Sequence, residues 1–205
     1  MTEFIVALDF DDAWEAGRLA SLLNREAGVG FFKVGARGLM HPGADLIDYL
    51  SDYDLMFDFK LYDTRDTVAA TAARAFALGA RFLTVHATPS MLAAAMAAKT
   101  DERQKVLAVG PLTDDSGFNF WPSGDQADGL VLPVDYEKFI RRNYAGLIVC
   151  PGIRLASGSP DNHVRPATPA EARAAGADYI VVGRPIIAAA DPVAAARAIM
   201  EELSQ

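Results

Sequence analysis

Two charged residues, Asp58 and Lys60, stand in an otherwise apolar stretch of the chain, Leu55–Lys60. In a β-strand the side chains alternate between two faces, so Asp58 and Lys60 share one face while Phe57 and Phe59 share the other. Charges in an apolar wall are costly unless they are paired. Such a carboxylate–ammonium pair can transfer protons or stabilise charge that develops in a reaction. The alternative is a structural ion pair that only closes the end of the strand.

Two other apolar runs carry charges at matching positions. Asp9 lies near the end of Phe4–Phe10, and Lys33 lies in Phe31–Gly35. Alone, each is typical of a solvated residue at a strand end. Together with the first pair, they give two carboxylates and two ammonium groups at the ends of three neighbouring strands, which indicates a functional site.

Short apolar runs alternate with longer Ala-rich stretches along the chain, a pattern typical of a parallel α/β fold. Helix starts are indicated by a capping box with Pro169 at Thr168–Glu171 and by Asp191-Pro192. The expected strands are Phe4–Phe10, Phe31–Gly35, Leu55–Lys60, Phe82–His86, Val106–Leu112, Gly129–Leu132, Gly146–Cys150 and Tyr179–Gly183.

Eight strands with intervening helices predict one compact (β/α)8 TIM barrel domain over residues 1–205. Active sites of such barrels lie at the C-terminal ends of the strands. The fifth crossover is abbreviated, because Ser116–Ala127 carries Gly, Pro and Ser where a helix should be. An open doubly wound sheet is the alternative, but no G-x-G-x-x-G follows the first strand, which argues against a dinucleotide-binding form.

The composition limits the partners. The chain has 51% apolar and 22% charged residues and a formal charge of −8, which argues against nucleic acid and acidic membrane surfaces. An anionic substrate would need a locally basic site. Cys150 is the single cysteine, and the apolar run begins almost at Met1–Phe4, so we expect a cytoplasmic protein without a disulfide or signal peptide. No His, Cys and carboxylate spacing indicates a zinc site.

The segment from Asp58 to Thr67 resembles the D-x-K-x-x-D-x-x-x-T signature of the orotidine 5′-phosphate decarboxylase family, with Lys60 and Asp63 at its inner positions. Other parts of the resemblance follow in the same order, and they are Leu8-Asp9, Lys33-Val34-Gly35, Val85-His86-Ala87, Leu112-Thr113, Pro151-Gly152-Ile153-Arg154 and Val182-Gly183-Arg184-Pro185. D-x-K-x-x-D alone is shared with metal-dependent sugar-phosphate decarboxylases and aldolases of the same superfamily. These enzymes remain one alternative, and a catalytically silent nucleotide-binding barrel is another.

The resemblance implies a carboxy-lyase that converts orotidine 5′-monophosphate to uridine 5′-monophosphate in pyrimidine synthesis, without a metal or other cofactor. It implies that Lys60 donates a proton to C6 and that Asp58 lies beside the substrate carboxylate. Lys33 and Asp63 complete an alternating array of charges. It further implies a homodimer with shared active sites, in which Asp63 and Thr67 reach the substrate of the partner subunit.

The resemblance also implies which residues bind the substrate. They are Asp9 and Lys33 for the ribose, Ser116 for the pyrimidine edge, Gly183 and Arg184 for the phosphate, and Pro151. Without the rest of the set, Gly183-Arg184-Pro185 is typical of a turn with a surface ion pair. The chain departs from the family at Ala156, where a phosphate-binding Gln is usual, and a lone His such as His86 is more often structural than catalytic.

Overall fold

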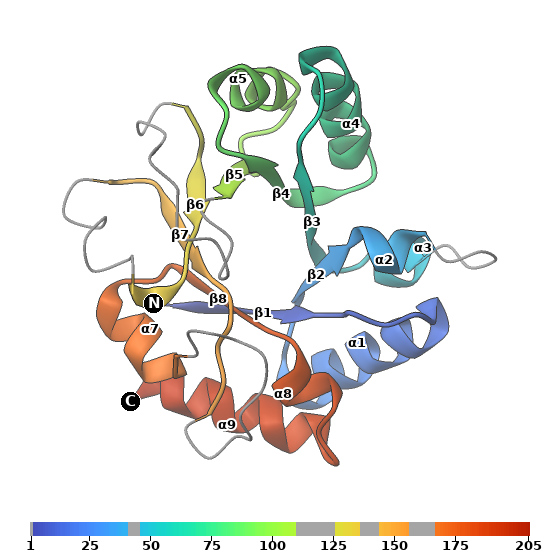
Figure 1. Cartoon of the computed structure of the whole chain (residues 1–205). Helices are drawn as coiled ribbons and strands as arrows, with labels where there is room; N and C mark the ends of the chain where they lie inside the picture. The colour runs from blue at the N-terminus through green and yellow to red at the C-terminus, as the bar shows by residue number, and fades with distance from the viewer. Residues whose placement is uncertain (1, 41–45, 110–125, 136–143, 156–166) are drawn as a thin grey trace.

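The computed structural model describes residues 2–40, 46–109, 126–135, 144–155 and 167–205. Eight parallel strands in sequence order close into a barrel, and the helices lie outside the ring of strands (Figure 1), so the predicted (β/α)8 barrel is confirmed. The strands are β1 (Glu3–Ala7), β2 (Phe31–Gly35), β3 (Asp54–Leu61), β4 (Ala80–His86), β5 (Lys105–Val109), β6 (Gly129–Val131), β7 (Leu147–Cys150) and β8 (Tyr179–Val182).

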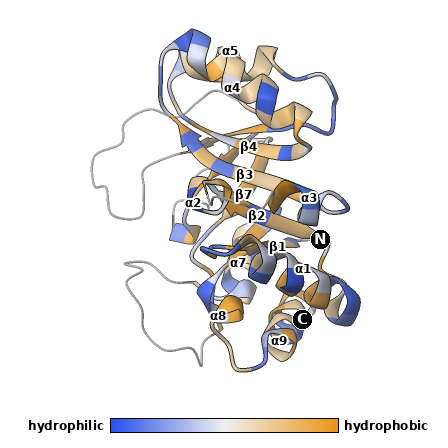
Figure 2. Cartoon of the chain, turned by 90° about the vertical axis from the view of Figure 1, so that its right-hand side faces the viewer, coloured by the Kyte–Doolittle hydropathy of each residue, from blue (hydrophilic) through white to orange (hydrophobic). Residues whose placement is uncertain are grey.

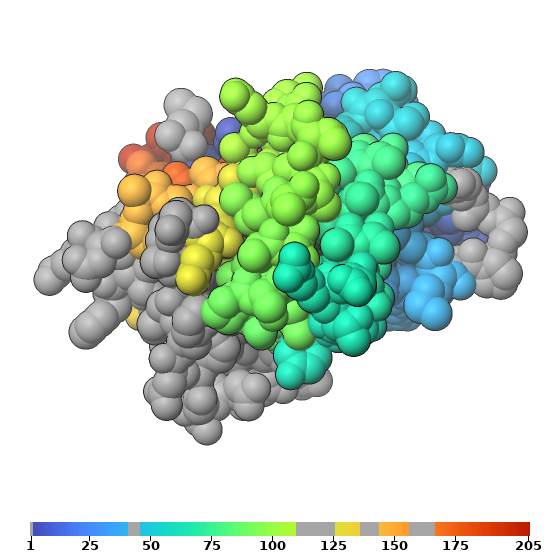
Figure 3. All heavy atoms as spheres, turned by 90° about the horizontal axis from the view of Figure 1, so that it is seen from above, coloured from blue at the N-terminus to red at the C-terminus, as the bar shows by residue number. Residues whose placement is uncertain are grey.

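The helices begin at the signals that the sequence carries. Asp191 accepts a hydrogen bond from the Ala194 N–H, and Thr168 forms the predicted capping box with Glu171. The helices are α1 (Ala13–Ala27), α2 (Ala36–Leu39), α3 (Leu46–Leu50), α4 (Arg65–Ala77), α5 (Pro89–Ala97), α7 (Pro169–Ala175), α8 (Arg184–Ile187) and α9 (Pro192–Ser204). Helices α4 and α5 pack side by side on the face seen in Figure 3. None of the helices in the described ranges is long and apolar enough to cross a membrane.

Some predicted boundaries are wrong. Strand β1 ends at Ala7 rather than Phe10, because only one more ladder bond follows, from the Leu8 N–H to the Lys33 carbonyl, before Asp12 caps α1. Of the predicted strand at residues 106–112, positions 110–112 lie outside the described residues. The same holds for residues 116–125 of the crossover expected to be abbreviated, so that expectation stays a prediction.

Alternate residues of each strand pack into two separate apolar layers. The outer layer, between strands and helices, includes Val6, Phe32 and Phe57. The inner layer fills the barrel with Ile5, Ala7, Phe31, Met56, Phe82, Leu107, Val131, Val149, Tyr179 and Val181. The strands are accordingly mostly hydrophobic, while hydrophilic residues gather on helices and loops (Figure 2). Because Met56 faces inward, Asp58 two residues later faces inward as well.

An aromatic cluster forms the floor of the barrel interior. The rings of Phe31, Phe82 and Tyr179 meet edge to face, with centroids 4.9 to 5.8 Å apart. The Arg81 guanidinium lies 5.1 Å from the centroid of Phe31 and donates to Asp54 at 2.6 Å. Edge-to-face rings beside a paired cation give the barrel a rigid N-terminal end.

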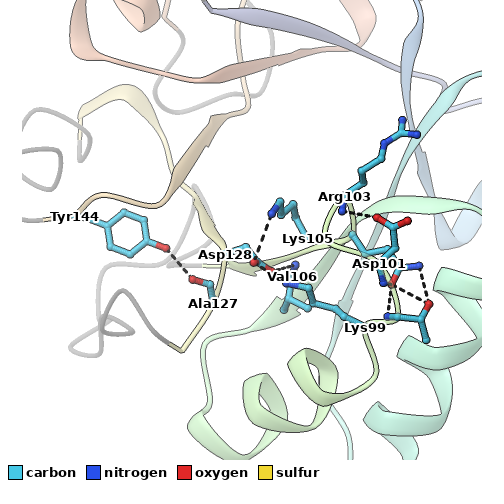
Figure 4. Close-up of polar contacts among 10 residues, drawn as sticks. Lys99, Asp101, Arg103, Lys105, Val106, Ala127, Asp128 and Tyr144 are labelled. Carbon is cyan, nitrogen blue, oxygen red and sulfur yellow. Dashed lines mark hydrogen bonds and ion pairs between the residues drawn. The ribbon is translucent and has the colours of Figure 1, made fainter.

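Asp128, which directly precedes β6, binds the start of β5 (Figure 4). Its carboxylate accepts from the Val106 N–H at 2.8 Å and from Lys99 Nζ at 2.7 Å. Asp178 does the same before β8, where it accepts from the Ile148 N–H at 2.8 Å. Each carboxylate accepts a hydrogen bond from a backbone N–H near the start of a strand. It thereby fixes the position of that strand at the N-terminal end of the barrel.

We expect Phe82→Ala to lower the free energy of unfolding by about 3–5 kcal/mol, because the ring is 1% exposed and its loss leaves a cavity in the floor. Phe82→Leu refills most of that volume and should cost clearly less. Urea unfolding of both variants measures the difference. Equal losses in the two variants would contradict a closely packed floor.

Candidate active site

A cavity opens at the C-terminal end of the barrel. Among the residues that the structure describes, its lining consists of Ala7, Asp9, Lys33, Met56, Asp58, Lys60, Val131, Pro151, Gly152, Ile153, Arg154, Val181, Gly183, Arg184 and Pro185. This lining has four basic and two acidic side chains, in a chain whose formal charge is −8. The cavity is therefore the locally basic site that an anionic substrate requires.

The Asp58 carboxylate lies at the centre of the polar wall of this cavity. Lys60 Nζ donates to its two oxygens at 2.8 and 2.9 Å, and Lys33 Nζ lies 3.4 Å from Oδ2. Thr84 Oγ1 donates to Oδ1 at 3.0 Å. The Asp58 side chain is only 13% exposed, so these contacts replace its hydration.

Two opposing effects act on the pKa of Asp58. Burial raises the pKa, while the Lys33 and Lys60 ammonium groups and the hydrogen bonds from Lys60 and Thr84 lower it. The lowering effects outweigh burial, and the pKa lies below its ordinary value. Asp58 is therefore ionised at neutral pH and holds both lysines by charge.

A distortion of β3 positions Lys60. Phe57 pairs with Leu83 of β4, but the next pair is Leu61 with Val85, so the ladder shifts register between them. Lys60 has a φ of 47°, the left-handed region that side chains other than glycine rarely adopt. Strained backbone of this kind clusters at functional sites, and here it sets the direction of the Lys60 side chain.

Lys33 connects the first three strands. Its Nζ donates to Asp9 Oδ1 at 3.1 Å while it faces Asp58 on the other side. Gly183 lies close to the same place, because a Cβ there would be 3.4 Å from the Ala7 Cβ and 3.6 Å from Asp9 Oδ2. The missing side chain keeps the end of β8 close to β1.

Gly183 and Arg184, which the resemblance assigns to phosphate, lie on the same cavity lining as Pro151, which it assigns to the substrate. These residues follow two different strands, β7 and β8. Ser116 and Ala156 lie outside the described residues, so their predicted roles stay predictions.

Asp63 and Thr67 are placed differently from the other predicted residues. Both are exposed at the start of α4, and neither belongs to the cavity lining among the described residues. The Asp63 carboxylate accepts from the Thr64 N–H at 2.6 Å, and the Thr64 and Thr67 hydroxyls lie 2.9 Å apart. Thr64, which lies between them, caps the helix by accepting from the Thr67 N–H, and neither Asp63 nor Thr67 belongs to the Asp58 cluster.

His86 lies at the end of β4 and outside the described lining of the cavity. Its ring meets the ring of Tyr62 edge to face, with centroids 5.3 Å apart. Burial lowers the pKa of His86, and the charge of Lys60 lowers it further. The neutral imidazole is a packing partner next to the charged cluster.

Two residues of the site have no predicted role from the sequence. Thr84 contacts both Asp58 and Lys60, and Arg154 lines the cavity. The signal for Thr84 was present, since it shares an inward face with Phe82 in the alternation of β4. Arg154 follows β7 as Gly183 and Arg184 follow β8. Within the described ranges, no three His, Cys, Asp or Glu residues come together as a metal ion would need.

We expect His86 to titrate below the ordinary imidazole pKa, and its pKa to rise in Lys60→Ala, because a repelling charge is lost. The unfolded chain then binds a proton at higher pH than the folded one. The free energy of unfolding therefore falls as the pH drops from about 6.5 toward the folded-state pKa.

Histidine NMR titrations of the wild type and Lys60→Ala measure this effect. Lys105→Ala is the matched control. It removes the same charge at the first residue of β5, whereas His86 lies beside the last residue of that strand. An equal His86 pKa in the wild type and Lys60→Ala would contradict the placement of the Lys60 ammonium.

Comparison with known proteins adds an independent observation. The sequence model of the Orotidine 5'-phosphate decarboxylase / HUMPS family matches residues 2–199. An orotidine 5'-phosphate decarboxylase of Afipia carboxidovorans is 38% identical over 224 aligned positions, which cover 98% of this chain and 94% of that protein. One from Rhodopseudomonas palustris is also 38% identical, with the same coverage.

Solved structures agree with the sequence relatives. The crystal structure of orotidine 5'-phosphate decarboxylase from Lactobacillus acidophilus has a TM-score of 0.81 and 31% identity, with 100% of both chains covered. The enzyme from Pyrococcus horikoshii, with a TM-score of 0.78 and 24% identity over 98% of this chain and 99% of that one, shares the fold. From the family match and these relatives, the chain belongs to the Orotidine 5'-phosphate decarboxylase / HUMPS family.

Proposed function

We propose that the protein is an orotidine 5′-phosphate decarboxylase, which converts orotidine 5′-monophosphate to uridine 5′-monophosphate in pyrimidine synthesis. The observation that carries this proposal is the buried Asp58 carboxylate between the ammonium groups of Lys33 and Lys60. The relatives of the chain carry the same activity in their names. The net positive charge of the cavity lining suits a substrate with a phosphate and a carboxylate.

The reaction breaks the bond between C6 of the pyrimidine and its carboxylate, and the electron pair stays on C6 as carbon dioxide leaves. An sp² carbon without an electron sink holds this charge poorly. The Lys60 ammonium can stabilise the charge and then give its proton to C6. Asp58 orients Lys60 through the two hydrogen bonds from Nζ, and its repulsion of the substrate carboxylate disappears when carbon dioxide departs.

The remaining lining residues bind parts of the substrate that do not react. In our proposal Gly183 and Arg184 bind the phosphate, and Pro151 contacts the substrate. Arg154 adds a second guanidinium to the same lining. Asp9 and Lys33 receive the ribose hydroxyls, and Ser116 the pyrimidine edge. Binding energy from the phosphate can then be used to order the reacting groups.

The position of Lys33 favours this reaction over that of a metal-dependent sugar-phosphate enzyme. A divalent cation needs several oxygen ligands, and the described part of the cavity lining offers two carboxylates, Asp9 and Asp58. The Lys33 ammonium lies between them, at 3.1 Å from Asp9 and 3.4 Å from Asp58. Its charge thus occupies the place that a cation would take. We propose catalysis without a metal or other cofactor.

We further propose that the chain acts as one barrel domain in a homodimer, and that the dimer lies in the cytoplasm. Asp63 and Thr67 are exposed next to the cavity strand β3 but outside the described lining. This placement suits residues that contact the substrate of the partner subunit and complete its array of charges. The single cysteine, Cys150, suits a reducing compartment.

The wild type should turn over orotidine 5′-monophosphate in the presence of EDTA. Lys60→Ala should lower kcat at least about 10³-fold, because it removes both the charge and the proton donor. Absorbance decay of the substrate measures both rates. Lys105→Ala, a lysine at the opposite end of the barrel, is the control and should keep its activity. Activity that EDTA abolishes would favour the metal-dependent alternative, and no activity would favour a silent nucleotide-binding barrel.

Shared active sites predict that two inactive variants restore each other. Lys60→Ala and Asp63→Ala should each lose activity, while dimers mixed from equal amounts of both should regain about a quarter of the wild-type activity, since half of the dimers carry one intact site. Co-expression followed by a turnover assay and a light-scattering mass checks this. Activity no higher than the sum of the two variants would show that Asp63 acts within its own subunit.

A further inference from the structure

Thr84 is fully buried, with 0% exposure, although Thr is a polar residue type that mostly lies at the surface. It lies on β4 between Leu83 and Val85, the two residues at which the ladder to β3 loses its register. Because Leu83 pairs with Phe57 and Val85 with Leu61, Thr84 alone stands opposite the three intervening residues of β3. A buried hydroxyl at an irregular point of a sheet needs partners on both sides.

The Thr84 hydroxyl has such partners. The Lys60 backbone N–H donates to Oγ1 at 2.9 Å, and Oγ1 lies 3.0 Å from Asp58 Oδ1. An N–H can only donate and an ionised carboxylate can only accept, so the hydroxyl proton must point to Asp58. The direction of both hydrogen bonds is thereby fixed.

Each bond meets a specific need of the site. The hydrogen bond from the Lys60 N–H to Thr84 Oγ1 replaces a backbone bond of the ladder that the register shift removes. It does so at a residue whose φ of 47° is unfavourable for any residue with a Cβ. The bond to Asp58 fixes the carboxylate oxygen that also accepts from Lys60 Nζ at 2.9 Å. One hydroxyl thus holds Lys60 by its backbone and, through Asp58, by its ammonium group.

We infer that Thr84 is a positioning residue for the reaction proposed above, on which this inference rests: its hydroxyl fixes the Lys60 backbone and the Asp58 carboxylate so that the Lys60 ammonium faces the reacting carbon. Thr84 is not one of the described residues that line the cavity. It acts through Asp58 and Lys60. Its loss should therefore impair the chemical step more than substrate binding, because the residues assigned to phosphate and ribose keep their places.

Two substitutions separate the hydroxyl from the shape of the side chain. Thr84→Val keeps the volume and removes both hydrogen bonds, and it should lower kcat about 10- to 100-fold with KM changed by less than about 3-fold. Thr84→Ser keeps the hydroxyl and should return kcat to within about 3-fold of the wild type. Thr2→Val is the matched control, since it removes a hydroxyl that donates to the Ala177 carbonyl far from the cavity.

Amide hydrogen exchange at Lys60 tests the inference without any turnover. Exchange should be slow in the wild type and Thr84→Ser, and at least about 10-fold faster in Thr84→Val. Thr84→Ala, which also lacks the hydroxyl, serves in both assays if Thr84→Val does not fold. Unchanged exchange and unchanged kcat in the variants without hydroxyl would overturn the inference, as would a Thr84→Ser variant as slow as Thr84→Val.

The two assays also separate this inference from the proposed function. A wild type without turnover, with Lys60 exchange that depends on the Thr84 hydroxyl, would overturn the proposed reaction but support the structural role of Thr84. If the wild type is active and Thr84→Val has the same Lys60 exchange rate and the same kcat as the wild type, the proposed reaction stands. The role of Thr84 is then overturned.

Discussion

The attraction between one buried carboxylate and two ammonium groups organises the catalytic end of this barrel. Asp58 is charged in spite of burial because Lys33, Lys60 and Thr84 together more than offset its lost hydration. Breaking such a cluster at one partner leaves an unpaired buried charge, which is strongly destabilising. The arrangement of β1 to β4 is therefore constrained by the need to bring these side chains together, and the Lys60 side chain is held at the cavity wall as a result.

The N-terminal end of the barrel stabilises the fold, and its C-terminal end carries the candidate site. At the N-terminal end, the aromatic floor around Phe82 and the carboxylates of Asp128 and Asp178 fix the starts of the strands. At the other end, β3 departs from regular pairing and Lys60 takes an unfavourable backbone conformation. A rigid N-terminal half can support backbone strain in the C-terminal half, where the active sites of such barrels lie.

Much of this could be predicted from the sequence, because strand alternation is a local property. The pattern of Leu55–Lys60 places Phe57 outward and Asp58 inward, and the order of apolar runs gives the barrel. What could not be predicted depends on pairing between distant segments. No local pattern shows that β3 slips against β4, so neither the φ of Lys60 nor the two bonds of Thr84 follow from the sequence. For the same reason the sequence predicts a first strand that extends to Phe10, since apolar residues continue past Ala7, where β1 ends.

In our proposal, the Asp58 cluster and the basic lining form one binding site for a pyrimidine nucleotide. A crystal structure of the protein with uridine 5′-monophosphate would show the contacts of this site. We expect Lys60 Nζ within about 3.5 Å of C6 and the phosphate on Arg184, with Asp58 still bound to Lys60. A nucleotide bound elsewhere, or bound in this cavity with its base turned away from Lys60, would contradict it.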